Sequence, residues 1–283
     1  GLGTKILYMT HNLLKGKRGL IFGALDDNSI AWKVAEKAHA EGAKFVLSNS
    51  PIALRKKDIF KLAEKTNSQV IAADITEISE LEDLFEEAMQ MLGGKIDFIL
   101  HSVGMSPNVR KNVPYHELNY DYLEKTLDVS AISLHKVLSV AQRLDAINDW
   151  SSVVTLSYIA AQRTFSSYSD MAHAKAMLES IVRQFGYHLG VKKKVRINSI
   201  SQSPTRTTAG AGVSGFNAFF NYADAMSPLG NAPADSCADV CISLFSDYTK
   251  MITMQNIYND GGFSSMGISN KLIEQYIDCG CGE

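Results

Sequence analysis

The chain has 283 residues, 46% of them hydrophobic, and a formal net charge of −2. The hydrophobic fraction is ample for a full core, so no metal or disulfide staple is needed, and the lack of a basic excess argues against a nucleic-acid partner. No apolar run approaches the length of a membrane span, so we expect no membrane partner. The length admits one large α/β domain or two smaller ones.

Residues 1–8 are left out of the expected fold. They lack the basic start followed by an apolar core that marks a secretory signal, and Met9 is the expected natural start. We expect these eight residues to be added sequence or a disordered N-terminus.

Short apolar runs alternate with longer helical patterns, which predicts repeated βαβ units and a mostly parallel sheet. No linker-like break interrupts this pattern. We therefore expect one Rossmann-like, doubly wound α/β domain over residues 9–270, with helices on both faces of a seven-stranded sheet, and a C-terminal tail over 271–283. The seven expected strands are Arg18–Gly23, Lys44–Ser48, Gln69–Ala73, Ile96–His101, Ser152–Leu156, Val195–Ile200 and Met254–Tyr258.

The end of the first strand has the features of a phosphate-binding turn. Gly23, Ala24 and a polar turn lead into a helix that begins at Ser29 and ends at Gly42. Backbone amides at such a helix start can cradle a pyrophosphate. A plain strand-to-helix turn, with Gly23 present for packing, is the alternative that this segment alone leaves open.

Small or polar residues also follow the other expected strands. Parallel strands end at one edge of the sheet, where open α/β sheets bind their ligands, so a dinucleotide lying across that edge would account for all of these positions together. They are Ser50 after the second strand, Asp74 and Ile75 after the third, Ser102, Val103 and Gly104 after the fourth, and Pro204 and Thr205 after the sixth.

The fifth strand is followed by two tyrosines and a lysine. Tyr158 comes directly after the apolar run, and Tyr168 is expected near the start of the next helix, with Lys175 two turns further along the same face. A lysine ammonium can hold a ribose diol and lower the pKa of a neighbouring phenol, which in turn can hydrogen-bond a substrate oxygen as it gains charge. Two other Tyr–Lys pairs have the same spacing, so the spacing alone does not decide.

Residues 206–230 carry no strand pattern and are expected to form a substrate-binding lid. Gly210, Gly212 and Gly215 match GxGxxG, but they follow the sixth strand by several residues and do not form a strand-to-helix turn, so we reject them as a phosphate loop and expect them to act as hinges. The lid's apolar side chains would close over an acyl chain and exclude water; they are Phe216, Phe219, Phe220, Tyr222 and Met226.

Of the four cysteines, Cys237 and Cys241 are expected to be small core residues on a helix, while Cys279 and Cys281 belong to the tail. The chain has no strong metal-ligand spacing with a paired histidine, so no metal site is expected.

Taken in order, these residues resemble the short-chain dehydrogenase/reductases and, among them, the bacterial enoyl-acyl carrier protein reductases of type II fatty acid synthesis. No Tyr-x3-Lys occurs in the chain, and the six-residue separation of Tyr168 from Lys175 is the mark of the enoyl reductases. The motifs that carry the resemblance are Gly23-Ala24, Ser29-Ile30-Ala31, His101-Ser102-Val103-Gly104, Leu156-Ser157-Tyr158, Tyr168 with Lys175, Pro204-Thr205 and Asp260-Gly261-Gly262-Phe263.

The resemblance implies NAD(P)H-dependent reduction of a trans-2-enoyl group carried by acyl carrier protein, in a cytoplasmic homotetramer. It implies that Tyr168 stabilises charge on the thioester oxygen, that Lys175 holds the nicotinamide ribose, and that Tyr158 lines the acyl site, so these three are the expected catalytic residues. Met105 and Phe216 are expected to join the two tyrosines at the substrate. The cofactor would meet Gly23, Ser29, Ile30, Ser50, Asp74, Ile75, Ser102, Val103, Gly104, Lys175, Pro204, Thr205 and Thr207.

The chain departs from the family pattern in several places. The acid that usually follows the second strand of NADH sites is missing, because that strand ends Ser48-Asn49-Ser50, so the cofactor can be NADH or NADPH. Arg55, Lys56 and Lys57 lie close enough in sequence to meet a 2′-phosphate. The family's usual asparagine is replaced within Leu127-Asp128-Val129-Ser130, and Gln202-Ser203 stands where Ala-Gly is common. Residues 207–230 contain no Lys or Arg, so the family's carrier-protein docking surface cannot be transferred.

Two other functions remain open at this point. A carbonyl or alcohol oxidoreductase is disfavoured by the absent Tyr-x3-Lys and the apolar lid. A dinucleotide-binding regulator would have no need of both tyrosines and the lysine.

Overall fold

A computed structural model describes residues 10–206 and 215–282. The expectations for residues 1–8, Thr207, Gly210 and Gly212 fall outside these ranges. Within them, no helix is both long enough and apolar enough to cross a bilayer.

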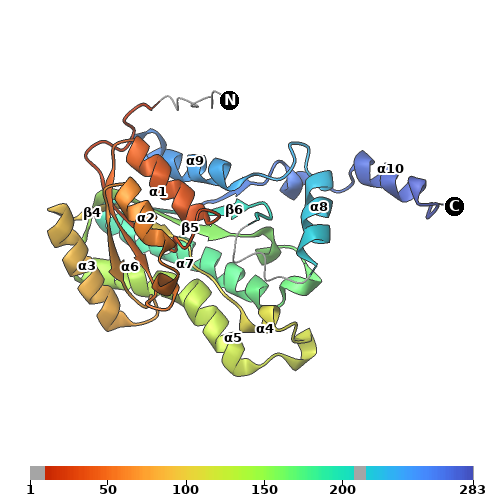
Figure 1. Ribbon diagram of the computed structural model, residues 1–283, viewed down its shortest axis with the longest axis horizontal. Helices are drawn as coiled ribbons and strands as arrows, with labels where there is room; N and C mark the ends of the chain where they lie inside the picture. Colours follow the sequence, from red (N-terminus) through yellow and green to blue (C-terminus); the bar gives the residue numbers. More distant parts are fainter. Residues whose placement is uncertain (1–9, 207–214, 283) are drawn as a thin grey trace.

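The structure contains one parallel sheet with the strand order β3-β2-β1-β4-β5-β6-β7 (Figure 1). The predicted seven-stranded parallel sheet is therefore confirmed. The chain winds outward from β1 to β3 and then crosses back to β4, so the order reverses between β1 and β4. The strands are β1 (Arg18–Phe22), β2 (Lys44–Asn49), β3 (Gln69–Ala72), β4 (Ile96–His101), β5 (Ile147–Ser157), β6 (Arg196–Gln202) and β7 (Asn256–Asn259).

Helices connect successive strands and cover both faces of the sheet (Figure 1). They are α1 (Ile30–Ala40), α2 (Asp58–Lys65), α3 (Ile78–Leu92), α4 (Pro107–Arg110), α5 (Tyr120–Leu127), α6 (Ser133–Arg143), α7 (Asp170–Lys193), α8 (Phe216–Met226), α9 (Ala234–Phe245) and α10 (Asn270–Asp278). A π-helical turn, η3 (Asp128–Ile132), joins α5 to α6. Short 3₁₀ turns are η1 (Ala53–Lys56), η2 (Tyr115–Glu117), η4 (Ile159–Ala161), η5 (Ser166–Tyr168), η7 (Asp247–Thr249) and η8 (Phe263–Ser265).

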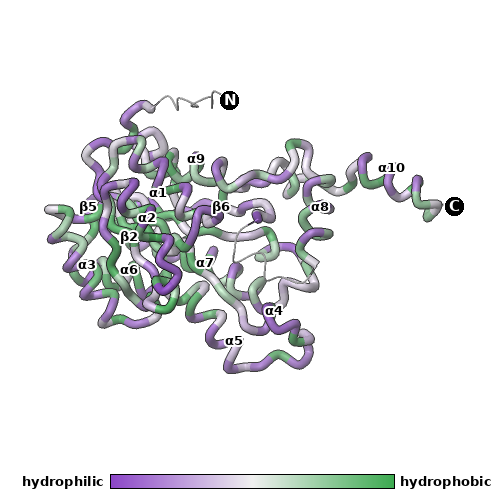
Figure 2. Tube along the Cα trace, in the orientation of Figure 1, coloured by the Kyte–Doolittle hydropathy of each residue, from purple (hydrophilic) through white to green (hydrophobic). Residues whose placement is uncertain are grey.

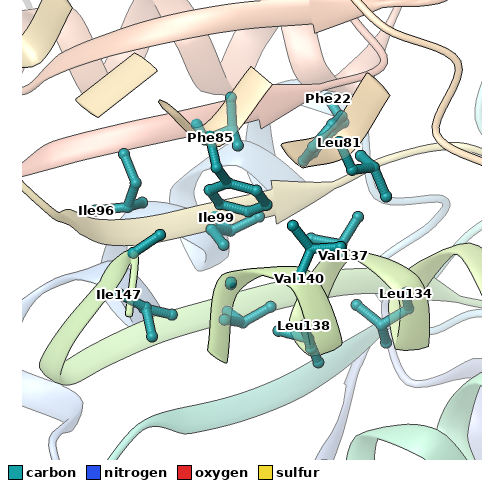
Figure 3. Close-up of a cluster of buried hydrophobic side chains, with 14 of the residues drawn as sticks. Phe22, Leu81, Phe85, Ile96, Ile99, Leu134, Val137, Leu138, Val140 and Ile147 are labelled. Carbon is teal, nitrogen blue, oxygen red and sulfur yellow. The ribbon is translucent and has the colours of Figure 1, made fainter. Parts of the chain in front are cut away.

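The core has two apolar layers, one on each face of the sheet, because successive side chains of a strand point to opposite faces. In β1, Leu20 and Phe22 point into the layer of α3, α6 and α7, whereas Ile21 points into the layer of α1, α2 and α9. Figure 3 shows the first layer, where Leu81 and Phe85 of α3 and Val137 and other residues of α6 gather over one face of the sheet. Hydrophobic residues accordingly concentrate in the strands, while the helices carry mixed colours around their surfaces (Figure 2).

Cys237 and Cys241 are buried in α9, as the sequence predicts. The tail expected after residue 270 contains α10, which extends away from the rest of the chain (Figure 1) and has no buried residue. Cys279 and Cys281 at its end are joined by a disulfide bond.

Candidate active site

Tyr158 lies at the carboxyl end of β5 and is 7% exposed. Its ring packs against the ring of Tyr168, with 5.0 Å between the ring centroids and 51° between the planes. The structure therefore brings together the two tyrosines that the sequence singles out.

Tyr168 does not lie on the helix of Lys175, so the prediction that one helix carries both side chains is wrong. Tyr168 ends the 3₁₀ turn η5, and α7 begins two residues later at Asp170. The break is at Ser169, whose φ of 51° and ψ of −131° are incompatible with a helix. This kink, rather than helical periodicity, sets the direction of the phenol relative to the lysine.

Lys175 is buried and held beneath the ends of β4 and β5. Its Nζ donates a hydrogen bond to the carbonyl oxygen of Leu156 at 2.8 Å. A Cβ placed on Gly104 would lie 4.0 Å from the same Nζ, so the ammonium also lies close to the segment after β4. Burial lowers the pKa of Lys175 to about 8, and the nearby charge of Glu179 acts in the opposite direction.

In this arrangement burial, rather than the lysine charge, dominates the pKa of the two phenols. Burial raises the pKa of both Tyr158 and Tyr168, and the charge of Lys175 is not among the causes of either shift. Burial penalises the charged phenolate, so both side chains stay neutral at physiological pH. Neutral phenols keep their protons and can donate hydrogen bonds.

The turn after β1 approaches the segment after β4 so closely that only glycine fits at Gly23. Its φ is +103°, and an added Cβ would lie 1.8 Å from the carbonyl oxygen of Ser102. Ser29 is the residue before α1 and Ile30 is the first residue of that helix. The turn at Gly23 has no side chain and leads to the N-terminus of α1. It also lies where the strand order reverses between β1 and β4. A dinucleotide pyrophosphate fits such a place.

The remaining residues predicted to meet the cofactor lie at the same edge of the sheet. Ser50 follows β2, Asp74 and Ile75 follow β3, Ser102, Val103 and Gly104 follow β4, and Pro204 and Thr205 follow β6. Ile75 is buried within the apolar layer of α3, α6 and α7, and Val103 packs against that layer. The side chains of Ile75 and Val103 therefore pack in the core, so mainly the backbone atoms of these two residues can contact a ligand.

Aromatic side chains surround the two tyrosines. The ring of Tyr158 lies 5.3 Å from that of Phe165 and 6.2 Å from that of Phe219 on α8, and Phe263 lies 6.2 Å from Phe165. Asp260 accepts hydrogen bonds from the backbone of Gly262 and Ser264, which shapes the turn that carries Phe263. The predicted lid therefore contributes one aromatic residue to an apolar wall beside the tyrosines.

That aromatic residue is Phe219, whereas the ring of Phe216 lies elsewhere. Phe216 packs against Phe220 at 5.9 Å, and the guanidinium of Arg206 lies 4.4 Å from the centre of the Phe220 ring. Helical spacing alone does not show which face of α8 turns toward the site. Met105 lies directly after Gly104, with its backbone N–H donating to the hydroxyl of Ser130 at 3.0 Å.

A small pocket opens beside Tyr158. It is bounded by β6, the segment after it and the turn of Asp260, and its lining residues are Tyr158, Ile159, Ser201, Gln202, Ser203, Pro204, Ala223, Asp260 and Phe263. The polar Gln202 and Ser203, which stand where the family often has Ala-Gly, form part of this wall. Apolar rings on one side and a few polar groups on the other are typical of a small-molecule site.

Two buried polar residues, His101 and Asp170, make supporting contacts around the site that were not predicted from the sequence. His101, at the end of β4, is held between the hydroxyls of Thr155 and Ser133 at 2.8 Å each, and burial lowers its pKa to about 3. Asp170 accepts hydrogen bonds from Ser106 at 2.6 Å and Asn108 at 2.8 Å, which joins α4 to the start of α7. Each of these hydrogen bonds joins residues more than thirty positions apart in the sequence, so no local sequence pattern predicts it.

Among the residues that the structure describes, no three His, Cys, Asp or Glu side chains gather in a way that could hold a metal ion. The polar groups that line the pocket are the phenol of Tyr158, the amide of Gln202, the hydroxyls of Ser201 and Ser203 and the carboxylate of Asp260, and such a mixed set suits the binding of an organic ligand.

Comparison with known proteins agrees with this geometry. The model of the family described as "Enoyl-(Acyl carrier protein) reductase" matches residues 23–264. The NADH-dependent enoyl-[acyl-carrier-protein] reductase FabI of Rickettsia bellii is 32% identical over 94% of this chain and 100% of its own length. The crystal structure of a FabI–NADH complex from Alistipes finegoldii is 60% identical, with a TM-score of 0.92 over 94% of both chains.

A Bacillus cereus enoyl-acyl carrier protein reductase, solved with NADP⁺ and indole naphthyridinone, is 29% identical, with a TM-score of 0.84 over 90% of this chain and 99% of that one. Because the family match spans most of the chain, in the order that the motifs predict, this protein belongs to the enoyl-(acyl carrier protein) reductase family.

Proposed function

We propose that this enzyme reduces trans-2-enoyl groups carried by acyl carrier protein, with NADH or NADPH as the reductant, in fatty acid elongation. The observation that carries the proposal is the packing of neutral Tyr158 against Tyr168, with the buried ammonium of Lys175 bound to Leu156 two residues before Tyr158, at the edge of the sheet where Gly23 opens a phosphate turn.

Each of the three side chains has a separate task. The Tyr168 hydroxyl donates a hydrogen bond to the thioester carbonyl oxygen and stabilises the negative charge that builds there during reduction. Tyr158 lines the acyl site and supports the Tyr168 ring by direct contact. Lys175, pinned to Leu156, holds the ribose hydroxyls of the cofactor. When bound, the reduced nicotinamide supplies hydride to the β-carbon of the enoyl group.

The cofactor would lie along the carboxyl ends of the strands. Backbone groups at Gly23, Ser29 and Ile30 would hold the pyrophosphate, and the remaining contacts would come from Ser50, Asp74, Ile75, Ser102, Val103, Gly104, Lys175, Pro204, Thr205 and Thr207. This assignment rests on the shared edge of the sheet and on the space that Gly23 leaves.

The acyl chain would pass between the aromatic cluster and α8. Met105 joins the tyrosines in this proposal, and Phe219 takes the place of Phe216, because the ring of Phe219 contacts Tyr158 whereas that of Phe216 packs against Phe220. Residues 206–230 would act as a lid that orders when cofactor and inhibitor bind. Equal hydrogen-exchange protection of α8 with and without both ligands would contradict this role.

We extend the proposal to the partner and the assembly. Acyl carrier protein delivers the thioester to a single reductase domain over residues 9–270, which works in the cytoplasm as a homotetramer. Sedimentation of the purified protein at several concentrations tests the tetramer directly.

The decisive experiment follows oxidation of NADH and of NADPH separately, with a short trans-2-enoyl thioester and with the same group on acyl carrier protein. Substrate-dependent oxidation is expected, and Tyr168→Phe should lower kcat by about 10²–10³-fold, as for the loss of one oxyanion-hole donor. Tyr187→Phe is the matched control, because Tyr187 is an exposed tyrosine of α7.

Other outcomes would redirect the assignment. Turnover of ketones but of no enoyl substrate would establish a carbonyl reductase. Cofactor binding without turnover of either enoyl substrate would establish a dinucleotide-binding regulator.

A further inference from the structure

Glu179 is a buried carboxylate that the proposed chemistry does not use. It is 4% exposed and lies on α7 one turn beyond Lys175. One carboxylate oxygen accepts a hydrogen bond from the hydroxyl of Ser157 at 2.7 Å, and the other accepts a short hydrogen bond from the side-chain amide of Gln162. Burying a charged group costs free energy, so the burial of Glu179 with these two partners needs an explanation.

The two partners of Glu179 stand on either side of Tyr158 in the sequence. Ser157 directly precedes the tyrosine, and Gln162 follows it after the turn η4. Lys175 binds the carbonyl of Leu156, one residue further back. Lys175 and Glu179, one turn apart on α7, therefore both hydrogen-bond to the end of β5, immediately before Tyr158.

The charges around Lys175 come from several elements. On α7, Glu179 lies on the same face as Lys175, with Arg183 one further turn along. Burial raises the pKa of Glu179, while its hydrogen bonds with Ser157 and Gln162 and the charges of Arg183 and Lys175 act in the opposite direction. From β4, His101 faces Lys175 but is neutral, because burial lowers its pKa to about 3. From β7, the hydroxyl of Tyr258 reaches Gln162 at 3.3 Å. Glu179 is the one anion among these groups.

We propose that Glu179 is a positioning residue, which fixes Tyr158 through Ser157 and Gln162 and places a carboxylate one helical turn from the ammonium of Lys175. This inference rests on the proposed function. Glu179 itself is not among the residues that line the pocket. The hydrogen bonds to Ser157 and Gln162 depend on the length of the Glu179 side chain, whereas its effect on Lys175 depends on its negative charge.

Two substitutions of Glu179 separate the effect of side-chain length from the effect of charge. Glu179→Gln keeps the length of the side chain and removes its charge, so the pH above which NADH binding weakens should fall by about one unit. Glu179→Asp keeps the charge but shortens the side chain, so the hydrogen bonds to Ser157 and Gln162 are lost. In this variant kcat should fall about tenfold, while the pH profile of NADH binding should stay unchanged. NADH binding is measured by calorimetry without substrate, and kcat with the enoyl thioester.

Asp97→Asn is the matched control. Asp97 also accepts two hydrogen bonds, from the backbone N–H of Arg18 at 2.8 Å and from Asn148 at 2.9 Å, but it lies in β4 at the opposite edge of the sheet. This variant should lose stability without moving the pH profile of NADH binding or kcat.

The outcomes divide cleanly. Wild-type kinetics and an unchanged binding profile in a folded Glu179→Gln protein would overturn the inference, as would an equal shift in Asp97→Asn. If the wild-type protein itself shows no enoyl turnover, the proposed function fails, and the calorimetric profile still tests the effect on Lys175. If Glu179→Gln does not fold, Ser157→Ala takes its place: it should lower kcat several-fold, and unchanged kcat would then overturn the inference.

Discussion

The ammonium of Lys175 is tied to the carbonyl oxygen of Leu156 by a 2.8 Å hydrogen bond, so the lysine is fixed in place by the strand that ends at the active site. Burial lowers its pKa to about 8 from the usual 10.5. The side chain is therefore charged below pH 8 and becomes neutral as the pH rises through 8.

This titration predicts opposite effects of pH on binding and on stability. NADH affinity should fall roughly tenfold between pH 7 and 9, as the charge-assisted contact is lost. Between pH 8 and 10.5 the unfolded chain holds a proton on this lysine that the folded chain has released, so the free energy of unfolding gains a contribution that rises with pH. Calorimetry and urea unfolding measure the two quantities. Lys175→Met should remove both dependences, and their persistence in that variant would contradict the assignment.

Gly23→Ala should damage both the fold and the cofactor site. The added Cβ would meet the carbonyl of Ser102, and the positive φ is unfavourable for alanine. Gly93→Ala is the control, because Gly93 has a φ of +75° and open space around it. We expect Gly23→Ala to cost about 1–3 kcal/mol more than Gly93→Ala in urea unfolding, with NADH binding lost. Equal costs would show that the contact with Ser102 relaxes freely.

Lys56→Ala should shift the cofactor preference toward NADH. Lys56 forms an ion pair with Asp26, which holds its charge beside the turn after β1 and raises its pKa. Asn49, at the end of β2, uses its amide on the carbonyl of Ala24 and on its neighbour Ser50, so no carboxylate there repels a 2′-phosphate. The ratio of kcat/KM for NADPH to that for NADH should fall about tenfold, the effect of one phosphate contact.

Lys61→Ala controls for the loss of a positive charge in the same region, since Lys61 is exposed on α2. It should leave the cofactor ratio unchanged, and an equal change in both variants would assign the effect to overall charge rather than to Lys56.

Ser169→Gly should stabilise the fold and weaken catalysis. Ser169 has a backbone conformation that favours glycine, and among the described residues its buried hydroxyl finds no hydrogen-bond partner. Relief of this strain should raise the free energy of unfolding by about 1 kcal/mol. Because Ser169 directs Tyr168 into the site, the freer backbone should lower kcat for the enoyl thioester. A stabilised variant with full kcat would show that the kink is not needed for the position of Tyr168.

The sheet could be predicted because buried parallel strands leave continuous apolar runs in the sequence. The boundaries were less accurate where the pattern is mixed. β5 begins at Ile147 rather than at Ser152, because Asp149 and Trp150 at its start are exposed and Trp150 has a positive φ. A polar start of this kind resembles a loop until the neighbouring strand is known.

The site could be predicted only as far as strand ends and motifs allow. Helical periodicity placed Tyr168 on α7 because no residue type marks the kink at Ser169. It also could not show that Phe219, rather than Phe216, turns toward Tyr158, since that depends on how α8 is rotated against the sheet. The contacts of Asp170 and Glu179 form only when distant segments fold together.

The π-helical turn between α5 and α6 has a consequence for how this chain tolerates length changes. Its wider ring holds one more residue than an α-helical turn would, and it directs the Ser130 hydroxyl to both backbone groups of Met105, in the stretch where the family's usual asparagine is absent. Deleting one residue from 128–132 would make α5 and α6 a continuous α-helix. The deletion would also rotate every side chain on one flank by about 100° relative to the other. Ser130 and Ser133 could then no longer meet Met105 and His101 together. A deletion that makes the helix more regular would therefore remove the two hydroxyl contacts that hold the end of β4 and the segment after it.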